Sequence, residues 1–81
     1  MNRGRTDKSV LERIQDLVDE EHRFYEQGEM TDEDRRSLAD VEVELDQCWD
    51  LLRQRRALRE FGEDPSRARV RPEEVVENYE Q

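Results

Sequence analysis

The sequence is poor in residues that cross-link or interrupt a chain. Its 81 residues include one cysteine, one histidine, two prolines and three glycines, and only 6% are aromatic. A single cysteine excludes an internal disulfide framework and the paired-cysteine spacings of zinc sites. Isolated glycines exclude the glycine-rich loops that bind phosphate groups. We therefore recognise no catalytic machinery in the sequence and expect no cofactor.

Long hydrophobic runs are also missing. No stretch has the length of a membrane span or the apolar part of a signal peptide, so we expect a cytoplasmic protein without a membrane partner. The net charge of -9 argues against nucleic acid as the main partner, because phosphate neutralisation needs clustered lysine and arginine. Residues 7–50 carry 16 acidic side chains against 5 basic ones, whereas residues 51–71 carry seven arginines against three acids. This order favours contacts between acidic and basic stretches, within one chain or between chains.

Apolar residues at three- and four-residue spacing predict a first helix at about residues 9–27. Ser9 and Glu12 form the sequence pattern of a capping box, in which each side chain accepts a hydrogen bond from the other residue's backbone N–H. Gly28 is typical of a residue that ends a helix. The apolar stripe of this helix consists of Val10, Ile14, Leu17, Val18, Phe24 and Tyr25.

Apolar spacing of the same kind predicts a longer second helix at about residues 31–61. Thr31 and Asp34 form a second capping pattern, and Gly62 follows the predicted end. Alternating steps of three and four residues are typical of a coiled-coil seam. The seam residues are Leu38, Val41, Leu45, Cys48 and Leu52, and Trp49 widens the seam. In this apolar seam Cys48 is expected to be an inert structural thiol.

The short link between the two helices predicts an all-α antiparallel hairpin over residues 1–62. Residues 63–81 should form an extended tail with a short helix at about residues 72–80, where Pro72 suits the first turn. Glu21 interrupts the apolar stripe near the turn, and we expect it to pair with Arg35 of the second helix. A chain of this size has a small core, so stabilisation by a further contact is expected.

A second apolar stripe follows another side of the second helix. Its residues are Val43, Gln47, Leu51, Leu58 and Phe61. Two helices cannot cover both sides of the longer one, so either the tail folds back over this stripe or another chain covers it. Beyond the predicted end of the first helix, Arg55, Arg56 and Arg59 should give the second helix a cationic overhang. The acidic residues of the tail complement those arginines.

The segments VEVELDQCWDLLRQRRALREFGEDP and RVRPEEVVENY, with the EEH stretch of the first helix, carry a resemblance to a known family. The chain resembles small actinobacterial proteins catalogued as domain of unknown function 2630. The resemblance covers nearly the whole chain and implies a bacterial cytosolic setting, but no activity, cofactor or catalytic residue. It implies that Leu45, Cys48, Trp49, Leu52, Arg53, Arg55 and Arg56 belong to the defining seam and surface of the family.

The sequence favours a non-enzymatic interaction or oligomerisation module. The expected partner is a second copy of the chain, which would give a four-helix bundle, or another protein. The expected contact residues are Leu51, Arg55, Arg56, Leu58, Arg59 and Phe61.

Two alternatives stay open. Asp19 and His22, three residues apart, could join Glu42 and Asp46 in a carboxylate and histidine metal site of the helical-bundle type. Because Asp19 points away from the apolar stripe, such a site would have to form across a dimer. The arginine cluster of the second helix could instead bind an anion or nucleic acid, although pairing with the chain's own acids is the simpler fate of arginines in so acidic a protein. The cluster consists of Arg53, Arg55, Arg56 and Arg59.

Overall fold

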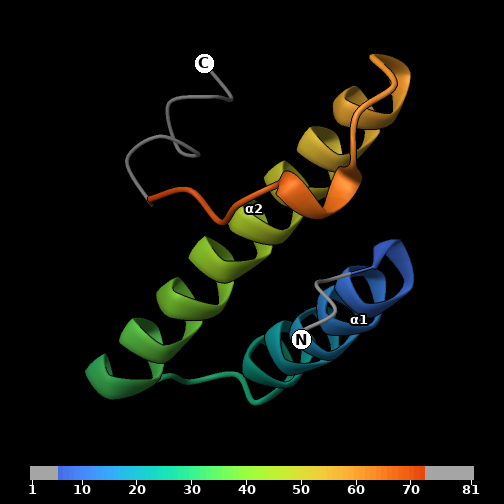
Figure 1. The fold of residues 1–81 in the computed structure, drawn as a ribbon. Coiled ribbons are helices and arrows are strands. Elements are labelled where there is room, and N and C mark those ends of the chain that lie inside the picture. The colour runs from blue at the N-terminus through green and yellow to red at the C-terminus, as the bar shows by residue number, and fades with distance from the viewer. Residues whose placement is uncertain (1–5, 73–81) are drawn as a thin grey trace.

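Two packed helices dominate the computed structural model, which describes residues 6–72 (Figure 1). Helix α1 spans Asp7–Glu26, helix α2 spans Asp32–Glu60, and a 3-10 turn, η1, spans Pro65–Arg67. The helices run antiparallel and pack against each other, so the predicted all-α hairpin is confirmed. Over the part of the chain that is described, no helix is both long and apolar enough to cross a membrane. The helix predicted at 72–80 lies outside the described residues.

Helix α1 begins two residues earlier than the sequence pattern predicts. Its N-cap is Thr6, whose side chain accepts a hydrogen bond from the backbone N–H of Ser9 at 3.0 Å, while the Ser9 hydroxyl accepts one from the Thr6 N–H at 3.0 Å. The prediction of Ser9 as the cap is therefore wrong. Two capping patterns overlap here, Thr6 with Ser9 and Ser9 with Glu12, and the structure has the first. The earlier start places Asp7 in the first turn, where the positive end of the helix dipole favours a carboxylate.

The other helix boundaries agree with the predictions. Thr31 caps α2, accepting a hydrogen bond from the Asp34 N–H at 3.0 Å, and the Asp34 carboxylate accepts one from the Thr31 N–H at 3.1 Å. Gly28 and Gly62 each follow a helix C-cap with positive φ angles of 84° and 74°. Glycine adopts this left-handed conformation without the steric strain that a Cβ atom would add.

The core lies between the facing sides of the two helices. From α1 it includes Val10, Ile14 and Leu17, and from α2 it includes Val41, Leu45 and Leu51. In the predicted seam, Cys48 and Leu52 are only partly buried. Leu51, which the sequence assigned to the second stripe, is instead 2% exposed. Its burial shows that something besides α1 covers that side of α2.

The chain itself covers Leu51. After η1 the backbone turns back along α2 (Figure 1), and we call residues 68–71 the return segment. Ala68 packs against the core, and Val70 lies beside the same hollow as Leu51. Of the two covers that the sequence left open for the second stripe, the tail is therefore the one present at Leu51.

Polar side chains of α2 hold the return segment through its backbone. The Gln54 amide nitrogen donates to the Arg69 carbonyl at 2.6 Å, and its oxygen accepts from the Arg69 N–H at 3.1 Å. Gln47 donates to the Arg71 carbonyl at 3.0 Å. Asp50, which is 1% exposed, accepts from Gln54 at 2.8 Å and pairs with the Arg71 guanidinium at 3.2 Å. A buried carboxylate is thus satisfied by one amide and one cation.

An ion-pair cluster holds the start of α1 on α2. Asp7 accepts a hydrogen bond from Arg55 at 2.6 Å and pairs with Arg59 at 2.9 Å. These hydrogen bonds from the two arginines lower the pKa of Asp7 below its ordinary value of 3.8. The predicted cationic overhang is therefore wrong at Arg55 and Arg59, because the earlier start of α1 brings a carboxylate opposite them.

We expect Thr6→Ala to lower the free energy of unfolding by about 1 kcal/mol, because the Ser9 N–H loses its acceptor. Glu12→Ala is the matched control and should change stability by less than about 0.5 kcal/mol. Urea unfolding followed by circular dichroism measures both. A larger loss in the Glu12 variant would place the cap at Ser9 after all.

The Asp7 cluster should respond to acid. Because the folded-state pKa of Asp7 is lowered, its contribution to stability is present above pH 3.8 and is lost as the pH falls through that lowered value. Asp7→Asn should therefore be less stable than the wild type at neutral pH, and the gap should narrow in strong acid. Urea unfolding across the acid range measures the gap, with Asp16→Asn as the exposed control. A gap that stayed constant with pH would contradict the assignment.

Asp50→Ala should destabilise the protein by roughly 1.5–3 kcal/mol, the range for hydrogen bonds to charged groups, because the anchor of Arg71 is lost. Asp40→Ala, an exposed carboxylate on the same helix, is the control. A double-mutant cycle with Arg71→Ala isolates the pair. Additive effects of the two substitutions would show that Asp50 does not hold the return segment.

Candidate interaction surface

Three of the six predicted contact residues are engaged inside the chain. Leu51 is in the core, and Arg55 is buried with its guanidinium on Asp7. Arg59 pairs with the same carboxylate. These contacts exist because α1 begins early enough to bring Asp7 opposite the arginines, and because the return segment covers Leu51. A partner could reach Leu51 and Arg55 only after those covers had moved.

The other three predicted contact residues lie farther out. Arg56 is exposed, Leu58 is half-buried, and Phe61 is 80% exposed at the C-cap of α2. Phe61 and Arg56 lie on different sides of α2, since five residues at about 100° each separate them by roughly 140°. The predicted surface is thus not one continuous patch.

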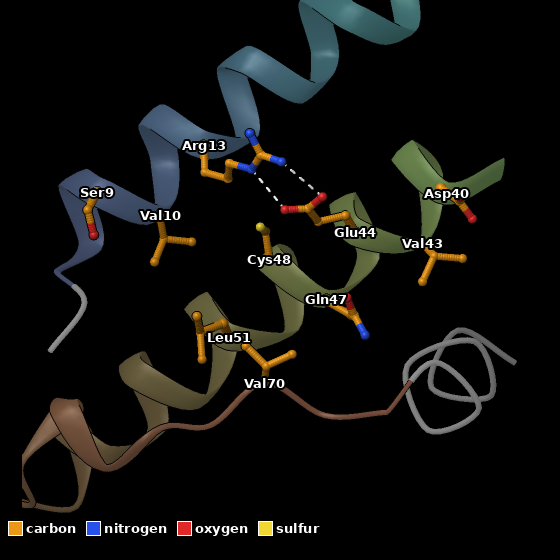
Figure 2. Close-up of a pocket in the computed structure, with 10 residues that line it drawn as sticks. All are labelled: Ser9, Val10, Arg13, Asp40, Val43, Glu44, Gln47, Cys48, Leu51 and Val70. Carbon is orange, nitrogen blue, oxygen red and sulfur yellow. Dashed lines mark hydrogen bonds and ion pairs between the residues drawn. The ribbon is translucent and has the colours of Figure 1, made fainter. Parts of the chain in front are cut away.

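A hollow of about 690 Å³ lies between α1, α2 and the return segment (Figure 2). Val10, Cys48, Leu51 and Val70 give it an apolar lining. The remaining lining residues are Ser9, Arg13, Asp40, Val43, Glu44 and Gln47. Figure 2 shows that it is formed by the first turns of α1, the middle of α2 and the return segment.

A bidentate ion pair crosses this side of the hairpin. Arg13 donates to the two carboxylate oxygens of Glu44 at 2.8 and 3.0 Å (Figure 2). The hydrogen bonds with Glu44 raise the pKa of Arg13, so the guanidinium stays charged. Both oxygens of Glu44 are occupied by the Arg13 guanidinium. We therefore assign the pair a structural role in the register of the two helices rather than a catalytic one.

The four predicted metal ligands do not come together. Asp19 accepts a hydrogen bond from Gln15 on its own helix, and His22 faces Glu26 at 3.9 Å with most of its ring exposed. Glu42 accepts a hydrogen bond from Tyr25. Among residues 6–72, no three histidine, cysteine or acidic side chains form a group that could hold a metal ion. A metal site would need ligands from a second chain.

The side of the hairpin opposite the hollow carries exposed apolar residues. Arg13 and Glu44 mark the hollow side, and the Tyr25 hydroxyl bonds Glu42 at 3.0 Å on the other side. On α2, Trp49 lies about 20° from Glu42 around the helix axis. We call this side the Trp49 face. By helical spacing, its apolar residues are Leu11 and Val18 of α1 and Trp49 and Leu52 of α2, and its flanking charges are Glu42 and Arg56.

Trp49 and Leu11 each leave nearly half of their surface exposed to solvent. Trp49 is 45% exposed and Leu11 is 47% exposed. Val18 and Leu52 of the same face are partly buried and pack against the core. The seam pattern predicts Trp49 only as a residue that widens the seam. The helical wheel carries the signal for its exposure, because Trp49 lies to one side of the line through Leu45 and Leu52.

Two carboxylates meet at one end of the Trp49 face. The pKa of Glu21 is raised, mainly by burial and to a lesser extent by a hydrogen bond with Glu42 and by the negative charge of Glu42. The hydrogen bond to Glu42 also raises the pKa of Tyr25. The predicted Glu21–Arg35 ion pair is wrong, because Arg35 pairs with Asp32 at 3.1 Å on its own first turn. This end of the face is therefore strongly acidic.

Comparisons with known proteins give a family but no activity. A family model described as "Protein of unknown function (DUF2630)" matches residues 6–81. Two similar proteins are "Uncharacterized protein Mb0922c" of Mycobacterium bovis and "Uncharacterized protein Rv0898c" of Mycobacterium tuberculosis. Each is 51% identical over 85 residues that cover 98% of both chains. No solved structure matches the chain. The chain therefore belongs to the DUF2630 family of proteins of unknown function.

Proposed function

We propose that this protein is a non-enzymatic association module that binds a protein partner through the Trp49 face. The observation that carries the proposal is the exposure of Trp49 and Leu11, which helical spacing places on the same flank of the hairpin. Tryptophan and arginine are the residues that most often dominate the binding energy of protein interfaces. Arg56, which the sequence predicts as a contact residue, flanks this face.

A difference between the two sides of α2 supports the Trp49 face as the binding surface. The predicted stripe at Leu51 is covered by the return segment, with Gln54 and Asp50 supplying its hydrogen bonds. On the opposite side no such cover lies over Trp49 among the described residues. An apolar surface that stays open to water favours association, because binding removes it from solvent.

The alternatives find less support. The arginine cluster needed for an anion site is partly neutralised by Asp7, which engages Arg55 and Arg59. The metal alternative lacks a group of ligands within residues 6–72. Association through an apolar face needs neither arrangement.

Site-specific photocrosslinking in a mycobacterial host tests the proposal. The chain carries a benzoylphenylalanine at position 49 in one variant and at position 36 in the other. Arg36 is exposed on the far side of the same helix, at about 140° from Trp49. We expect light-dependent adducts with a defined protein from position 49 and few from position 36. Equal or absent adducts at the two positions would overturn the proposed function.

A further inference from the structure

The charges flanking Trp49 are arranged with opposite signs at equal spacing. Glu42 lies seven residues before Trp49, and Arg56 lies seven residues after it. Seven residues make nearly two helical turns, so both charges lie about 10.5 Å from Trp49 along the axis and within about 20° of it around the axis. The face thus has an acidic end, an aromatic centre and a basic end.

Neither of the two charges that flank Trp49 has a partner of opposite sign within residues 6–72. At the acidic end, Glu21 and Glu42 approach closely enough for a hydrogen bond, and the pKa of Glu21 is raised as a result of burial and this neighbour. A nearby cation would relieve that like-charge contact. At the basic end, Arg56 is exposed and has no ion-pair partner within residues 6–72.

We propose that a second copy of this chain packs on the Trp49 face, with the two α2 helices antiparallel about a two-fold axis near Trp49, so that Arg56 of each chain meets Glu42 of the other. This inference rests on the proposed function and names its partner. In a two-fold interface the same residues face each other with exchanged roles. Because the charges are placed symmetrically about Trp49, one rotation satisfies both ends at once.

The alternative orientation of a second copy is unfavourable. With the α2 helices parallel and in register, Glu42 would face the partner's Glu42, and Arg56 would face the partner's Arg56. Like charges placed opposite each other disfavour that arrangement, as they do in coiled coils. The antiparallel arrangement also brings the two Trp49 rings together near the axis, with Leu11 of each chain beside them. The assembly is a four-helix bundle in which each hairpin contributes α2 and the Leu11 side of α1 to the interface.

Charge reversal tests the register. Light scattering over a concentration series, with reductant present to keep Cys48 reduced, should show a dimer for the wild type. Arg56→Glu should raise the dimer dissociation constant about tenfold or more, because two attractive pairs become repulsive. Glu42→Arg should act similarly. The double variant Glu42→Arg/Arg56→Glu should recover most of the lost affinity, since its pairs are exchanged rather than removed.

Matched variants separate the register from the face itself. Arg36→Glu makes the same change of charge away from the face and should leave the dissociation constant unchanged. Trp49→Ala should weaken the dimer in any arrangement that uses the face, and circular dichroism confirms that each variant is folded. If Arg56→Glu behaves like Arg36→Glu, or if the double variant is weaker than both single ones, the antiparallel register is wrong.

The oligomeric state tests the second copy as partner, and crosslinking at position 49 tests the Trp49 face as a binding surface. A wild-type chain that is monomeric at every concentration overturns the second copy as partner. The proposed function then depends on whether position 49 crosslinks to a different protein in cells. A crosslinked product of twice the chain's mass, lost in Arg56→Glu and restored in the double variant, supports both.

Discussion

The packing of Ile14 and Leu17 of α1 against Val41 and Leu45 of α2 is the contact on which the rest of the structure depends. The apolar stripes that the two helices bury against each other are narrow, and most of the charged residues beside them stay exposed. A domain this small buries a smaller fraction of its surface on folding than a larger domain does, so its stability is marginal. The chain therefore extends its core with an element that is neither helix nor strand, the return segment, which adds Ala68 against the core and closes over Leu51.

Polar contacts at three points keep the two helices in register around that core. Asp7 holds the first turn of α1 against Arg55 and Arg59, and Arg13 holds Glu44 farther along. Near the turn, the Tyr25 hydroxyl binds Glu42. The first two contacts join opposite charges, and the third joins a hydroxyl to a carboxylate. Between them they orient the apolar stripes, and they leave one side of α2 for the return segment and the other for the Trp49 face.

The sequence predicts the hairpin well because the signals for it are local. Thr31, Asp34 and the two turn glycines act within a few residues, and the structure confirms them. The start of α1 was mispredicted because Thr6 and Ser9 both head plausible capping patterns. What distinguishes them is the contact of Asp7 with Arg55, 48 residues away.

The candidate surface was harder to predict for the same reason. Nothing local to Asp50 marks it as buried, since its partners include Arg71, far along the chain. Leu51 and Leu52 are adjacent apolar residues, and only the path of the return segment makes Leu51 the more buried of the two. The exposure of Trp49 depends likewise on which side of α2 the tail occupies. Periodicity locates an apolar stripe but does not show what covers it.

The paired hydrogen bonds between Gln54 and Arg69 have a consequence for how the return segment can evolve. The side-chain amide of Gln54 donates to and accepts from the same residue, as a neighbouring strand does in one rung of a β-ladder. Only the main chain of residue 69 takes part, and every amino acid except proline offers that pair of groups. These hydrogen bonds therefore depend on the number of residues between η1 and residue 69 and not on the side chain at position 69. Substitution of Arg69 by any residue other than proline leaves these hydrogen bonds intact, whereas insertion or deletion of one residue between η1 and Arg69 displaces the peptide group that Gln54 holds.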